Sequence, residues 1–171
     1  MEADELLDRS RRRGGPAAAA AAAGLAAAPV RRAVILTCMD ARIDPALLFD
    51  LAPGDVHVLR NAGAVVTSDT RRSIAISQRK LGTRTVLLVA HTGCGLTSFT
   101  DEEFSTELQL DTGLRPPWRP GAFADPATNV ASGLAALHRD PFLVPGTVLR
   151  GFVLDIATFA LDEVPAPGDG A

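Results

Sequence analysis

The sequence predicts an α/β fold with a mostly parallel central sheet, flanked by helices and completed by an antiparallel edge strand. Two short apolar runs rich in β-branched residues, AVILTC at 33–38 and TVLLVAH at 85–91, have the pattern of strands covered on both faces. Helical patterns lie between these runs and again after them. Strands that alternate with helices are typical of a parallel sheet.

Three elements are expected between the two apolar runs. They are a helix at 45–51, a strand at 55–63 and a helix at 68–82. In the second helix, Ser68 or Asp69 can cap the start and Gly82 can end it. Four residues fall at helical spacing: Ile74, Ser77, Gln78 and Leu81. The first half of the chain therefore predicts a βαβαβ unit.

The second half of the chain predicts two more helices and two more strands. The helices are expected near 101–111 and 126–139. A fourth strand is expected within TVLRGFVLDI (147–156), joined tightly to a short edge strand within TFALDEV (158–164).

Residues 1–29 are expected to form an N-terminal helical arm, ADELLDRSRRR, followed by an alanine-rich connector. Residues 30–171 are expected to form one domain with a short flexible C-terminal tail. Positive charges followed by an alanine run imitate an export signal, but alanine is weakly apolar and acidic residues crowd the start of the chain. We therefore expect a cytoplasmic protein.

Composition excludes several classes of partner. The 171 residues are 47% hydrophobic, which is enough to bury a core. Charges of both signs are interspersed and the net charge is −3, so no basic face is expected for nucleic acid. The longest strongly apolar stretch falls short of 18 residues, so no membrane span is expected.

Potential metal ligands follow two of the predicted strands. Cys38 closes the first apolar run, while His91 and Cys94 lie at the end of the third strand. Ligands of open α/β sheets gather outside the carboxyl ends of the strands, so these side chains converge if the strands are neighbours. Two thiolates and an imidazole suit Zn²⁺, and three protein ligands leave a fourth position open, as in catalytic sites.

Simpler interpretations exist for each of these residues. A buried cysteine commonly acts as a small apolar residue, and the two cysteines could instead form a disulfide in an exported protein. An Asp-x-Arg pair, Asp40 and Arg42, also follows the first strand, where an ordinary loop salt bridge is the alternative. The co-location of all five residues at strand ends favours a metal site.

Three motifs carry a resemblance to a known family. CMDAR (38–42), RNAG (60–63) and HTGCG (91–95) resemble the β-class carbonic anhydrases, above all their shorter members, which are also similar in SIAISQRKLGTR (73–84) and FTDEEF (99–104). The resemblance implies that residues 30–171 are a catalytic domain that binds zinc, converts carbon dioxide reversibly to bicarbonate and a proton, and assembles as a homodimer or larger oligomer. It also implies five site residues: Cys38, His91 and Cys94 on zinc, with Asp40 and Arg42 beside it.

The predicted ligand set needs a further residue that assists the zinc-bound water. With two thiolates the zinc complex carries no net positive charge, so its bound water is expected to be less acidic than one held by three histidines. Asp40 can accept a hydrogen bond from the zinc-bound hydroxide, and Arg42 can hold that carboxylate bidentately and keep it ionised. Some members of the resembled family instead place the aspartate on zinc at rest, and raising the pH would release it.

Carbon dioxide is small and apolar, so its pocket needs an apolar wall. Gly63 is a candidate for close backbone approach to the metal, and Val66 is a candidate wall residue with plain core packing as its alternative. Arg60 and Asn61 are expected to hold the loop.

Two other functions remain open from the sequence. The same fold and metal could hydrolyse carbon disulfide or carbonyl sulfide, or the chain could be a non-catalytic zinc or thiol-binding protein. The presence of both Asp40 and Arg42 disfavours the second of these. Leu6 and Leu7 on a short charged arm cannot form a core alone, which favours packing across a partner subunit.

Overall fold

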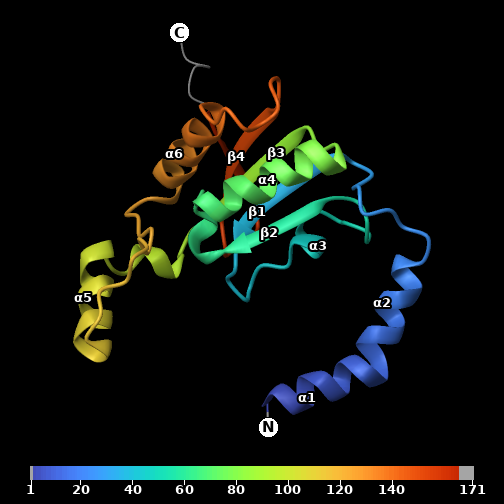
Figure 1. Cartoon of the computed structure of the whole chain (residues 1–171), viewed down its shortest axis with the longest axis horizontal. Coiled ribbons are helices and arrows are strands. Elements are labelled where there is room, and N and C mark those ends of the chain that lie inside the picture. The colour runs from blue at the N-terminus through green and yellow to red at the C-terminus, as the bar shows by residue number, and fades with distance from the viewer. Residues whose placement is uncertain (1, 166–171) are drawn as a thin grey trace.

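The computed structural model, which describes residues 2–165, contains a five-stranded sheet in the order β2-β1-β3-β4-β5 (Figure 1). The strands are β1 (Ala33–Cys38), β2 (His57–Asn61), β3 (Thr85–His91), β4 (Val148–Leu154) and β5 (Leu161–Val164). The first four are parallel, and β5 pairs antiparallel with β4. The predicted α/β fold with its antiparallel edge strand is confirmed.

Helices of several lengths connect and cover these strands. The α-helices are α1 (Glu2–Arg9), α2 (Gly15–Ala22), α3 (Pro45–Leu48), α4 (Ser68–Leu81), α5 (Asp101–Thr112) and α6 (Pro126–His138). A π-helical turn, η1 (Ser10–Gly14), joins α1 to α2, and two 3-10 turns follow strands, η2 (Ala62–Ala64) and η3 (Gly95–Thr97). Of the described helices, none is long and apolar enough to cross a membrane.

Helix α4 shows how local sequence sets an element. Its inward residues Ile74, Ser77 and Gln78 are buried as predicted, and Gly82 ends the helix in the left-handed conformation at φ 76°. The predicted cap was wrong by one residue. The helix already includes Ser68, so the residue before it, Thr67, is the cap. Thr67 keeps an extended backbone, and its hydroxyl accepts a hydrogen bond from the Thr70 N–H at 3.2 Å.

Two other elements differ from expectation. The alanine-rich connector is helical as far as Ala22, since alanine has the highest helix propensity and nothing in that run interrupts it. The predicted helix at 45–51 is a single turn that stops at Leu48, because Asp50 takes a positive φ of 49°. The predicted C-terminal tail lies largely outside the described residues.

The sheet is covered differently on its two faces. Helices α4 and α6 cover one face through residues such as Ile74 and Leu134, which pack on Val34, Leu36 and other strand residues. The other face carries a second cluster that includes Cys38 and Cys94 together with parts of α3 and the later loops. The candidate metal ligands therefore lie on the face opposite to α4 and α6.

Close packing of α6 on β4 depends on Gly151. A Cβ at this position would lie 2.3 Å from Val130 Cγ1 and 2.8 Å from Leu134 Cδ1. We expect Gly151→Ala to lower the free energy of unfolding by about 1–3 kcal/mol, because helix and strand must separate to admit the methyl group. Urea denaturation measures this change.

The matched control is Gly14→Ala, where the new Cβ meets nothing closer than the Arg9 carbonyl oxygen at 4.0 Å. Both substitutions reduce the conformational freedom of the unfolded chain in the same way. Equal unfolding free energies for the two variants would contradict the described packing of α6.

Candidate metal centre

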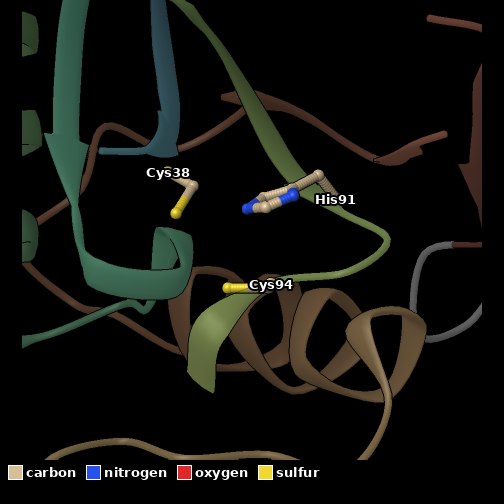
Figure 2. Close-up of side chains that lie close together, drawn as sticks. All are labelled: Cys38, His91 and Cys94. Atoms are coloured by element: carbon tan, nitrogen blue, oxygen red, sulfur yellow. The ribbon is translucent and has the colours of Figure 1, made fainter. Parts of the chain in front are cut away.

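Three potential metal ligands meet at the carboxyl ends of β1 and β3. These strands are parallel neighbours, so Cys38 at the end of β1 lies close to His91 at the end of β3. The chain then turns through Gly93 and brings Cys94 back toward both (Figure 2). The two Sγ atoms and a ring nitrogen lie within 4.8 Å of one another, and all three residues are buried. The structure thus brings together the three side chains that the sequence singled out.

The imidazole ring of His91 is oriented by a hydrogen bond to the backbone carbonyl of the next residue, Thr92. Its Nδ1 lies 2.9 Å from the Thr92 carbonyl oxygen, which can only accept, so Nδ1 carries the proton. Nε2 then presents a lone pair, and it is fully buried without a hydrogen-bond partner among residues 2–165. A metal-ligating histidine commonly donates its other ring N–H to a carbonyl group in this way.

The two sulfur atoms have different surroundings. Cys38 Sγ accepts a hydrogen bond from the Gly63 backbone N–H at 3.3 Å. Burial raises the pKa of the Cys94 thiol, and the Leu96 backbone N–H opposes that rise in pKa. A bound cation would remove the cost of two buried thiolates, so the donor set and its geometry fit a zinc ion.

The Gly63 backbone lies beside Cys38, one of the three ligand residues. Its φ is 73°, and a Cβ there would lie 2.6 Å from Leu96 Cδ2 and 2.8 Å from Phe123 Cε1. Both the conformation and the space exclude a side chain. This is why the Gly63 N–H can reach Cys38 Sγ.

Asp40 and Arg42 form a two-point ion pair beside the three ligand residues. Arg42 Nε donates to Asp40 Oδ1 at 2.9 Å and its Nη2 donates to Oδ2 at 2.7 Å, while the Arg42 backbone N–H adds a third bond to Oδ1 at 3.0 Å. These hydrogen bonds hold the pKa of Asp40 well below its usual range. Asp40 Oδ2 lies 3.8 Å from His91 Nε2. An ionised acceptor therefore borders the cluster.

Arg60 and Asn61 hold two loops beside the site. Arg60 Nε donates to the Cys38 carbonyl at 3.0 Å, and its Nη2 donates to the Asp40 carbonyl at 2.8 Å. Asn61 bridges its own loop by bonding both the N–H and the carbonyl of Val65. Arg42 Nη2 also reaches the Gly93 carbonyl at 3.2 Å, which ties the first loop to the turn before Cys94.

Val66 does not share the surroundings of the ligand residues. It packs against Leu88 and Val34 in the clusters under α4 and α6, and a Cβ on Gly133 would touch it. This placement corrects the expectation of a pocket wall in favour of core packing. The reason is that Val66 follows η2 and points to the sheet face opposite Cys38 and Cys94.

Three residues near the site were not predicted from the sequence. Leu96 and Phe123 pack against the cluster that holds Cys38 and Cys94, and Asn129 Nδ2 donates to the Gly63 carbonyl at 3.0 Å. Leu96 could have been found from its position two residues after Cys94. Phe123 and Asn129 come from a distant loop and from α6, and no sequence spacing links them to the site.

Fold and site together define an α/β protein with a buried cluster of two cysteines and a histidine, suited to bind a metal, at the carboxyl edge of a mostly parallel sheet. Residues 33–116 match the family model described as carbonic anhydrase. The chain is 46% identical over 140 residues to β-carbonic anhydrase 1 of Mycobacterium tuberculosis, covering 82% of this chain and 86% of that protein. The chain belongs to the β-carbonic anhydrase family.

Solved structures agree with this assignment. The carbonic anhydrase of Streptococcus mutans superposes with a TM-score of 0.87 at 32% identity and covers 96% of this chain and 98% of that one. In sequence, the chain is also 31% identical over 156 residues to a carbon disulfide hydrolase from an Acidianus strain, covering 77% of this chain and 76% of that protein. The family fold is therefore shared by enzymes named for two different substrates.

Proposed function

We propose that this protein catalyses the reversible hydration of carbon dioxide to bicarbonate and a proton, with Zn²⁺ held by Cys38, His91 and Cys94. The observation that carries this proposal is the buried ligand cluster with the lone pair of His91 Nε2 turned into it. Zinc in such a site supplies the Lewis acidity that makes water nucleophilic near neutral pH. The identity to β-carbonic anhydrase 1, higher than to the carbon disulfide hydrolase, supports carbon dioxide as the substrate.

Asp40 and Arg42 have distinct roles in this proposal. Asp40 Oδ2 faces the ligand cluster and can accept a hydrogen bond from the attacking water, which turns an oxygen lone pair toward carbon dioxide. Arg42 is a positioning residue, because its two donors fix both carboxylate oxygens of Asp40. With both carboxylate oxygens of Asp40 held by Arg42, a metal bound by the three ligand residues would keep room for a water molecule.

The apolar side of the site is proposed to come from Leu96 and Phe123. Both lie against the space that a side chain at Gly63 would fill, close to Cys38. An uncharged linear substrate needs such a surface more than it needs hydrogen-bond donors. Gly63 contributes because it has no side chain, so Leu96 and Phe123 can pack directly against its backbone beside Cys38.

The pH dependence of activity is a test of these roles. The pKa of Asp40 is well below its usual range, so this carboxylate stays ionised from pH 6.5 to 9 and does not set the profile. Forming the nucleophile from water releases a proton, so raising the pH favours it. We expect carbon dioxide hydration, followed by stopped-flow with a pH indicator, to be weak below neutrality and to rise steeply in mildly alkaline buffer. A flat rate from pH 6.5 to 9 would contradict the proposal.

We also infer a homodimer or larger assembly in the cytoplasm. The described arm from α1 to α2 buries none of its residues, and Leu6 and Leu7 are 64% and 52% exposed. Exposed leucines on a short helix favour a protein partner. Light scattering at micromolar concentration should give a mass of at least two chains, and a monomer would reject this inference.

A further inference from the structure

The turn η2 directs one backbone N–H at a candidate metal ligand. Gly63 lies in this turn, directly after β2, and donates its N–H to Cys38 Sγ at 3.3 Å; Figure 2 shows the chain passing beside this sulfur. A hydrogen bond to a metal-bound thiolate takes electron density from the sulfur, so the sulfur donates less to the metal. The direction of the Gly63 N–H is therefore a property of the metal site.

The turn η2 does not keep its conformation by local preference alone. Gly63 has a φ of 73° and the next residue, Ala64, has a φ of 55°, so two consecutive residues are left-handed. Alanine rarely adopts this conformation, and glycine reaches other conformations at little cost because it lacks a Cβ. Contacts from outside the turn must therefore keep the Gly63 N–H directed at Cys38.

Helix α6 supplies two such contacts. Asn129 Nδ2 donates to the Gly63 carbonyl at 3.0 Å, and because a carbonyl can only accept, this bond fixes the orientation of the Asn129 amide. The buried Ala64 packs in the cluster that contains Val130. Asn129 and Val130 are adjacent in the helix, so one turn of α6 holds both left-handed residues of η2.

Helix α6 is firmly held at this point. Its cap, Asp125, accepts the Thr128 N–H at 2.7 Å and the Thr128 hydroxyl at 2.8 Å. The Asp125 carbonyl accepts the Asn129 N–H at 3.1 Å. Val130 is fully buried against β4, where Gly151 allows a close approach. Asn129 thus lies between a capped helix end and the core, which suits it to fix the position of another group.

We propose that Asn129 is a positioning residue for the metal site, acting through Gly63 on the electron donation of Cys38. This inference rests on the proposed zinc site and extends it to a helix that covers the other face of the sheet. Two thiolates lower the Lewis acidity of a bound zinc ion, and a hydrogen bond to one of them restores part of it. Asn129 supports the chemistry of the site in this way without being a ligand.

Removal of the Asn129 amide tests the proposal in the full chain, loaded with Co²⁺ or with Zn²⁺. Asn129→Leu keeps the approximate size of the side chain without its donor, and Asn129→Ala is the second variant in case leucine does not fit, since alanine favours a helix. In both variants we expect the thiolate-to-Co²⁺ charge-transfer band to move to longer wavelength, because the sulfur electrons lose a stabilising hydrogen bond. The zinc dissociation constant, measured by competition with a chelator, should rise about 10-fold.

Gln78→Met separates this role from a general loss of stability. Gln78 on α4 also ties a loop through a buried amide, which donates to Thr147 Oγ1 at 2.8 Å and accepts the Val144 N–H at 2.9 Å. That loop precedes β4, at the end of the parallel strands opposite to the ligand cluster. The variant should melt at a lower temperature but keep the wild-type band position and zinc dissociation constant.

The two measurements decide the role of Asn129. A band and a zinc dissociation constant that stay unchanged in both Asn129 variants, or that change equally in Gln78→Met, would overturn the proposal. A wild-type protein that bound neither metal would overturn it together with the zinc site. Zinc-loaded wild type that failed to hydrate carbon dioxide would reject the proposed function alone, because neither the band nor the dissociation constant depends on turnover.

Discussion

Replacing Cys94 by serine is expected to remove stoichiometric zinc and to lower carbon dioxide hydration by at least about 100-fold. Serine supplies a hydroxyl in place of a thiolate, and Cys94 is one of three ligand residues within 4.8 Å of one another. Because metal binding is coupled to folding, the variant should also melt at a lower temperature. Metal analysis of the purified variant, together with stopped-flow hydration, measures both effects.

Met39→Ser is the matched control for this prediction. Met39 adjoins the ligand residue Cys38 in the chain but is 65% exposed, so the same replacement residue enters next to the site and faces solvent. It should retain zinc and most of its activity. If Cys94→Ser kept one zinc per chain, the ligand assignment would be wrong.

Arg42→Ala is expected to lower activity about 10- to 100-fold at every pH while leaving the zinc content unchanged. The substitution removes both side-chain donors to Asp40 and the bond to the Gly93 carbonyl, and it leaves only the backbone N–H on Oδ1, so the carboxylate can turn toward the metal. Arg42→Lys should fall between alanine and wild type, because lysine keeps the charge but cannot donate two parallel hydrogen bonds. Hydration rates of the three proteins from pH 6.5 to 9 provide the comparison.

Arg150→Ala controls for the loss of a two-point ion pair. Arg150 binds both carboxylate oxygens of Glu163 at 2.7 Å, with the same geometry as Arg42 on Asp40, but it does so on the β4–β5 hairpin. Its removal should leave hydration unchanged. An Arg42→Ala rate equal to that of Arg150→Ala would show that the Asp40 pair is only a loop salt bridge.

The ligand cluster could be predicted from the sequence because parallel strands constrain distant residues. Cys38 and His91 are 53 positions apart, but each closes a strongly apolar run, and neighbouring strands end at the same edge of the sheet. The pairing of Asp40 with Arg42 could also be predicted from the sequence, since a spacing of two residues in a turn brings their side chains within reach of each other. Both features depend on local sequence and on one rule of topology.

Other parts of the site depend on packing that no local pattern encodes. Val66 and Gly63 are three residues apart, but Val66 packs in the core under α6, whereas the Gly63 N–H, within η2, bonds Cys38 Sγ. Phe123 reaches the site from a loop after α5, and Asn129 reaches it from α6. The positions of Phe123 and Asn129 depend on how the later elements fold over the sheet.

Zinc reconstitution followed by carbon dioxide hydration tests the central proposal most directly. The protein would be stripped with a chelator, titrated with Zn²⁺ and assayed by stopped-flow at pH 8.5 after each addition. We expect activity to rise linearly with added zinc and to reach its plateau at one equivalent per chain, with metal analysis confirming that stoichiometry. A fully zinc-loaded protein that hydrates carbon dioxide no faster than buffer, or a stripped protein that remains active, would contradict the proposed function.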